Sequence, residues 1–224
     1  MIRYKYLIGL IALILLFLGT SIIPGGFIGC LEFCLLLTVV LVLLTITDCC
    51  ETKSSSTTLL LATAALALNW GSLVFPNKWL FLIHNLLFAL FFFRCGVNIL
   101  RPLYFCKSID LDAICAAICV YVLAGVSFAY IFGVVTLVND EAFSFASSGT
   151  SFLSTFGESS FSDLMYFSFV TMTTLGYGDV TPLSSAAKMI AVVQAIMGQF
   201  YMAVLVAKLV VLSEFNSRNE PGDS

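Results

Sequence analysis

The chain has 224 residues, of which 60% are hydrophobic and 10% are charged, and its mean hydropathy is +1.06. So few charged side chains cannot cover a water-soluble protein of this size, so the composition predicts a protein solvated by membrane lipid. The net charge of -3 is small and no basic cluster appears, which argues against nucleic acid as a partner.

Apolar runs divide the chain into predicted membrane-spanning helices. A span needs about 20 apolar residues, and we expect six such helices, at residues 6–23, 27–47, 58–75, 79–100, 113–138 and 184–212. All five prolines fall between or after these runs, as expected if each marks a helix boundary. The first run follows Arg3 and Lys5 and alternatively fits a signal peptide, but its uninterrupted length favours a retained helix.

The basic residues predict the orientation of these helices. With the N-terminus inside, eight basic residues face the cytoplasm and only Lys78 and Lys188 lie outside. We therefore expect an integral protein of the cell (inner or plasma) membrane with both termini cytoplasmic. The loop at 139–160 is then extracellular.

The first four runs contain few charged residues. A voltage sensor needs arginines at every third position of one helix, and the fourth run has only Arg94, near its inner end. We therefore expect little or no voltage dependence.

Three polar residues, Glu32, Asn69 and His84, fall at a similar depth, about 8 to 9 Å below the outer ends of their predicted helices. They fit a hydrogen-bonded latch that ties three helices together. Alternatively, a contact between Glu32 and His84, the only histidine, forms an acid sensor.

The sequence contains no catalytic set of serine, histidine and acid, and no nucleotide-binding loop. We therefore expect no enzyme activity, no cofactor and no soluble small-molecule substrate. The eight cysteines indicate no disulfide framework, because none of them lies in the loop at 139–160.

Between the last two runs, residues 161–173 form an amphipathic segment too short to cross the membrane, so we expect it to enter and return. The sequence Thr-Leu-Gly-Tyr-Gly-Asp follows at 174–179. Glycines on both sides of a tyrosine permit backbone conformations closed to residues with a Cβ, so successive carbonyl oxygens can turn toward one axis. Such oxygens can replace the water shell of a cation.

The segment at 161–182 resembles the pore loop of the potassium channel superfamily, and 187–208 resembles the inner helix of its small prokaryotic members with a two-helix pore. Leucine at 175 replaces the usual valine. The resemblance implies that four backbone carbonyls bind K+, those of Thr174, Leu175, Gly176 and Tyr177. It also implies that the Thr174 hydroxyl lies at the inner mouth.

Other roles follow from the same resemblance. Gly178 completes the outward turn, Asp179 lies at the outer mouth, and the Tyr177 ring packs against pore-helix aromatics. Tyr166 and Phe167 occupy positions where members often carry tryptophan, and Val170 stands where some carry a buried carboxylate. The full set expected to support the filter is Tyr166, Phe167, Val170, Thr171 and Thr173.

In the last run, Gly198 lies 20 residues after Gly178, at the position of the family's inner-helix hinge. The competing interpretation is that Gly198 is a small residue that allows close contact between helices. Gln199, Met202 and Val206 share a stripe expected to face a water-filled cavity. Because one loop per chain cannot surround an ion, we expect a homotetramer embedded in membrane lipid.

Together these features predict an all-α membrane protein with six transmembrane helices and a re-entrant pore helix and filter between helices 5 and 6. The expected parts are a four-helix domain at 1–110, a pore domain at 111–212 and a short cytoplasmic tail at 213–224. The expected function is passive, potassium-selective conduction. A less selective cation channel and a non-conducting regulatory subunit are the alternatives.

Overall fold

The computed structural model describes the backbone of residues 6–11, 13–14, 52–74, 77–105, 111–145 and 159–219. Residues 6–11 and 13–14 are helical. The other described elements are long helices, one short helix and two short strands. They are α3 (Thr52–Val74), α4 (Lys78–Phe105), α5 (Leu111–Val138), β1 (Phe143–Phe145), α6 (Ser159–Met172), β2 (Val180–Pro182) and α7 (Ser185–Asn219).

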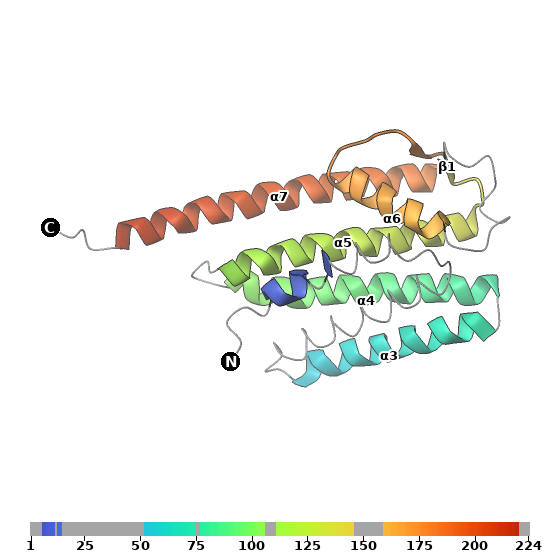
Figure 1. Cartoon of the computed structure of the whole chain (residues 1–224), viewed down its shortest axis with the longest axis horizontal. Coiled ribbons are helices and arrows are strands. Elements are labelled where there is room, and N and C mark those ends of the chain that lie inside the picture. The colour runs from blue at the N-terminus through green and yellow to red at the C-terminus, as the bar shows by residue number, and fades with distance from the viewer. Residues whose placement is uncertain are drawn as a thin grey trace.

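The long helices lie side by side, and neighbours run in opposite directions (Figure 1). Helix α4 packs against both α3 and α5, while the short α6 packs against both α5 and α7. After α6 the chain turns back toward the end from which α6 started, and α7 then runs along the same side of the bundle (Figure 1).

Three described helices contain stretches long and apolar enough to cross a membrane, at Lys78–Arg101, Leu111–Val138 and Ser185–Lys208. Helix α3 contains a shorter apolar stretch at Thr57–Leu68. The protein is therefore an integral membrane protein. The predicted helix at 27–47 lies outside the described residues, as does most of the one at 6–23, so the count of six spans stays a prediction.

The helices extend beyond the predicted apolar runs. Helix α3 begins at Thr52 instead of residue 58, and α7 continues to Asn219 instead of ending at 212. Hydropathy marks only the part of a helix that lies in lipid, and a helix continues into water because its backbone hydrogen bonds are internal. The expectation that Pro102 ends a helix was wrong, because α4 continues to Phe105.

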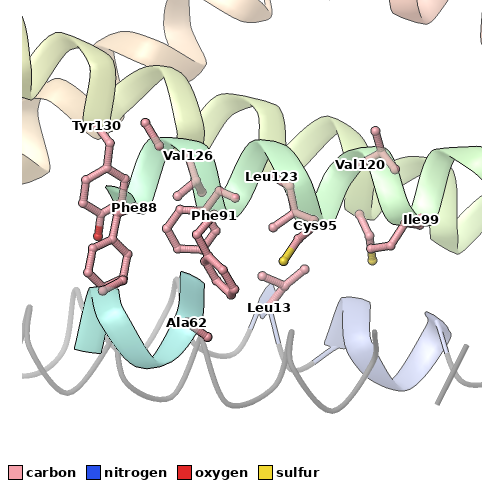
Figure 2. Close-up of a cluster of buried hydrophobic side chains, with 14 of the residues drawn as sticks. Leu13, Ala62, Phe88, Phe91, Cys95, Ile99, Val120, Leu123, Val126 and Tyr130 are labelled. Carbon is pink, nitrogen blue, oxygen red and sulfur yellow. The ribbon is translucent and has the colours of Figure 1, made fainter. Parts of the chain in front are cut away.

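The larger of two clusters of buried hydrophobic residues in the described part of the chain joins α4 to α5. Phe88, Phe91 and Phe92 on α4 are completely buried, and the α5 residue Tyr130 stacks on two of them, with ring centroids 5.2 Å from Phe88 and 5.5 Å from Phe92. Figure 2 shows buried side chains of α4 and α5 lying close together over several helical turns, with Ala62 of α3 near them. Helix α4 therefore packs against α5 through aromatic side chains.

The first helix is attached to the start of α5 by a carboxylate. Asp112 Oδ1 accepts hydrogen bonds from the backbone N–H groups of Tyr6 (2.9 Å) and Leu7 (3.2 Å). A single carboxylate oxygen of α5 thus accepts from two successive backbone N–H groups. Asp112 thereby holds residues 6–11 against the bundle.

Candidate functional site

Helix α6 ends in a hydrogen-bond pattern that fixes where the next segment begins. The N–H of Leu175 bonds Val170 O at 2.9 Å, and the N–H of Thr174 bonds Thr171 O at 3.1 Å. These two bonds form a Schellman motif, in which the residue after the helix adopts a left-handed conformation and is usually glycine. Here that residue is Thr174, with a φ of 61°. A β-branched residue in this conformation stores about 1–3 kcal/mol of strain.

The segment at 173–179 alternates in backbone handedness. Thr174 (61°), Gly176 (58°) and Gly178 (82°) have positive φ values, and Leu175 and Tyr177 between them do not. Such an alternation permits successive peptide groups to turn the same way, the conformation that a row of carbonyl oxygens on one side requires. A Cβ at either glycine would meet nothing within 4 Å, so crowding does not explain the glycines. Their positive φ values do, because residues with a Cβ rarely adopt them.

Every side chain from Thr173 to Asp179 is exposed in the single chain, including two large apolar ones, Leu175 at 58% and Tyr177 at 67%. The Tyr177 ring nevertheless has one partner on α6. It stacks nearly parallel to Tyr166, with an interplanar angle of 6° and ring centroids 6.4 Å apart. The segment is thus held against α6 at Tyr177, and the role of this ring in a filter stays a prediction.

Asp179 is fixed through both of its carboxylate oxygens. The Tyr166 hydroxyl donates to Oδ2 at 2.8 Å, and the backbone N–H of Val180 donates to Oδ1 at 3.0 Å. The hydrogen bond to Asp179 raises the pKa of Tyr166 to about 12, so the hydroxyl keeps its proton and remains the donor. Tyr166 therefore supplies a contact that Val170, which stands in place of a carboxylate, cannot make.

A two-stranded sheet secures the far end of the segment. Strand β1 pairs with β2 in antiparallel register, with Phe143 opposite Pro182 and Phe145 opposite Val180. Ala142 O also accepts a hydrogen bond from the N–H of Leu183 at 2.8 Å. The chain leaving the 173–179 segment is thus attached to the chain that leaves α5.

The side of α6 away from the 173–179 segment is buried in aromatic residues. Phe167 packs edge-on against Phe132 of α5 and Phe143 of β1, with ring centroids 5.1 and 5.2 Å apart. Its ring therefore supports α6 from behind. Of the other expected support residues, Thr173 donates from Oγ1 to Phe169 O at 2.6 Å.

A buried polar contact joins α7, α6 and α5. Gln194 of α7 is fully buried and donates from Nε2 to Ser168 O (3.0 Å) and to Ser168 Oγ (2.7 Å). The Ser168 hydroxyl in turn donates to Gly125 O at 2.6 Å. Gln194 Oε1 has no partner among the described residues, and a buried unpaired amide oxygen costs about 1–3 kcal/mol. Neither Gln194 nor Ser168 was predicted as a site residue, because the sole sequence signal of each is a polar side chain in an apolar or aromatic run.

The last carbonyl of α6 is enclosed by two other helices. The Tyr121 hydroxyl of α5 donates to Met172 O at 3.0 Å. A Cβ at Gly198 of α7 would lie 2.6 Å from the same oxygen, closer than real Cβ contacts allow. Glycine at 198 is therefore needed for close packing of α7 on α6, and the hinge role stays a prediction.

The predicted cavity residues lie further along α7. Gln199, Met202 and Val206 are all exposed in the single chain, which leaves them free to face another surface or water. The cavity itself stays a prediction.

The proposed latch near the outer side is described only in part. Glu32 and the side chain of Asn69 lie outside the described residues. The His84 ring packs edge-on against Phe88 with centroids 4.7 Å apart, and neither of its nitrogens has a hydrogen-bond partner in the described part of the chain. Both the latch and the acid sensor stay predictions.

Residues 118–214 match the model of a protein family described as "Ion channel". This range begins within α5 and includes α6, the 173–179 segment and most of α7. No curated protein and no solved structure gives a significant match. The membrane helices and the matched range thus define an ion-channel domain. The match supports a relationship between this domain and the potassium channel superfamily.

Proposed function

We propose that the protein is a potassium-selective channel that conducts K+ passively through a four-fold pore. The alternating backbone handedness at Thr174, Gly176 and Gly178 carries this proposal, because it suits a row of carbonyl oxygens. Dehydrated K+ would bind the carbonyls of residues 174–177, with the Thr174 hydroxyl at the inner mouth. The C-terminal end of α6 points its partial negative charge toward the start of this row.

A homotetramer follows from the same assignment. One segment offers oxygens from one side only, so four copies are needed to surround an ion. The exposure of Leu175 and Tyr177 supports this assembly, since large apolar side chains are costly to leave in water. The exposed apolar residues of α7, such as Phe200 and Val204, provide further surface for contact with lipid and with neighbouring subunits.

The channel would respond weakly to voltage. Arg94 and Arg101 are the basic residues of α4 after its first turn, and their spacing of seven gives no repeated array of gating charge. The basic residues further favour cytoplasmic termini in the cell membrane, which places Asp179 and the loop after α5 outside.

Ion flux from liposomes tests the proposal directly. Purified protein should release K+ down its gradient, barium should block the release, and Tyr177→Ala should abolish it without loss of assembly. Absence of flux from assembled protein would favour a non-conducting regulatory subunit. Reversal potentials in mixed K+ and Na+ then measure selectivity. Equal permeability to both ions would favour the less selective cation channel, for which the leucine at 175 is the sequence argument.

A further inference from the structure

Helix α7 approaches α6 through small residues with one exception. The fully or largely buried positions of its described face are Ala187, Ala191, Gln194 and Gly198, spaced four, three and four residues apart. This spacing places them on one side of a helix. Alanine and glycine allow the two backbones to approach closely, whereas the glutamine reaches across to α6.

Gln194, the exception among these small residues, makes specific hydrogen bonds. The Gln194 amide donates both of its hydrogens to Ser168, one to the backbone carbonyl and one to the hydroxyl. The Ser168 hydroxyl donates to Gly125 O of α5, where a Cβ on the glycine would lie 2.5 Å from the Phe169 ring. Gln194 keeps these contacts although its own Oε1 stays unpaired among the described residues. An apolar side chain at this buried position would avoid the free-energy cost of an unpaired polar atom.

The contact lies at a position that controls the 173–179 segment. Ser168 is one helical turn before Met172, the last residue of α6, or about 6 Å along the axis. The segment begins directly from this helix end through the Schellman bonds of Thr174 and Leu175. A rotation or slide of α6 would therefore move the carbonyl oxygens of the segment by a similar distance.

We propose that Gln194 is a positioning residue for ion selectivity. It locks α6 between α5 and α7 through Ser168 and so sets the positions of the carbonyl oxygens that bind the ion. The inference rests on the proposed channel function. Any movement of α7 at this level is transmitted to α6 through the same contact.

Two measurements on the assembled full-length channel test the inference. The first is the K+ to Na+ permeability ratio, and the second is hydrogen exchange of the α6 backbone amides. Gln194→Met keeps the side-chain length but removes the donors, and Gln194→Asn keeps the amide but is too short to reach Ser168. We expect either variant to lower the permeability ratio about tenfold, the equivalent of one or two hydrogen bonds. Exchange in α6 should become faster.

Matched variants separate this role from a general loss of packing. Ile196→Met alters the same helix at a half-exposed position and should leave both measurements unchanged. Ser168→Ala should lower the ratio less than Gln194→Met does. The double variant should lose less than the two single effects combined, because both remove one contact.

The outcomes are distinct. A parental permeability ratio in the assembled Gln194→Met and Gln194→Asn channels overturns the inference, whether or not exchange in α6 changes. If only one of the two variants assembles, its ratio decides. If the parent protein itself does not discriminate K+ from Na+, the proposed function fails. In that case, an unchanged rate of hydrogen exchange at the α6 backbone amides of the Gln194 variants would overturn the positioning role of Gln194 independently of selectivity.

Discussion

The hydroxyl of Tyr166 and the carboxylate of Asp179 are 2.8 Å apart, although 13 residues separate them in the chain. This contact spans the 173–179 segment, because Tyr166 lies on α6 before it and Asp179 ends it. The stacked ring of Tyr177 lies between these two anchors. The part of the segment after Gly176 is therefore closed into a loop by side chains of its own chain.

Loss of this contact should loosen the outer end of the segment. We expect Tyr166→Phe, which keeps the ring but removes the donor, to lower the K+ to Na+ permeability ratio about threefold. Tyr166→Trp is the matched control, because the indole N–H is a donor and should retain most of the selectivity. Reversal potentials of the purified channels measure the effect. A parental ratio in Tyr166→Phe would show that the hydrogen bond does not determine selectivity.

External acid should reduce inward K+ current through a carboxyl group near the outer mouth. Burial, followed by the negative charge of Asp179, raises the pKa of Asp163 above its usual value. A carboxyl group with a raised pKa gains its proton earlier as the pH falls, so the attraction for cations is lost at a higher pH than for free aspartate. We expect the current to begin to decline at a higher external pH than the ordinary pKa of aspartate would give.

In Asp163→Asn, the part of the current loss that occurs at the higher pH values should be absent. Glu141→Gln, at an exposed position after α5, is the matched control and should keep it. Because the folded state disfavours the charged form of Asp163, its removal should not lower thermal stability at neutral pH. A pH profile in Asp163→Asn identical to that of the parent contradicts the assignment.

The sequence predicts those parts of the fold that depend on local composition. The end of α5 at Val138 was predicted at the correct residue, because a sharp change from apolar to acidic residues follows it. The backbone conformation after α6 was also foreseeable, because glycines at 176 and 178 have few other uses. The end of α4 was misjudged, because proline near a helix end removes few backbone hydrogen bonds and does not force the helix to stop.

Contacts between distant residues were not predictable in the same way. Ser168 and Gln194 are 26 residues apart, and each alone resembles an ordinary polar residue in an apolar or aromatic run. Their pairing depends on how closely α7 approaches α6, which Ala191 and Gly198 determine jointly. The resemblance predicted a supporting role for Tyr166 but not its partner. The hydrogen bond to Asp179 depends on how the chain turns back after α6, which the sequence alone does not specify.

The strained conformation of Thr174 permits a test of its side chain. Glycine adopts a φ of 61° without strain, so Thr174→Gly should fold as stably as the parent or up to about 1–2 kcal/mol more stably. It should nevertheless conduct less K+, because the hydroxyl at the proposed inner mouth is lost. Thr174→Ser, which keeps the hydroxyl, should conduct nearly as well as the parent. Thermal unfolding and K+ flux together measure this, and full conduction by Thr174→Gly would refute a role for the hydroxyl.

A methyl group at Gly198 should be far more harmful than one at Gly96. A Cβ at 198 would lie 2.6 Å from the backbone oxygen of Met172, whereas a Cβ at 96 would meet nothing within 4 Å. We therefore expect Gly198→Ala to lower stability by about 1–3 kcal/mol, because α7 must move away from α6. Gly96→Ala should raise it by up to about 1 kcal/mol, because alanine favours helix over glycine.

Thermal unfolding of the two purified variants distinguishes the competing roles of Gly198. If glycine serves only as a hinge, alanine should stiffen α7 and reduce channel opening while Tm stays the same or rises. If close packing on Met172 requires it, Tm should fall together with selectivity, because the end of α6 is displaced. A parental or higher Tm for Gly198→Ala would therefore exclude the packing role, since the oxygen of Met172 is backbone and cannot rotate away from the added methyl group.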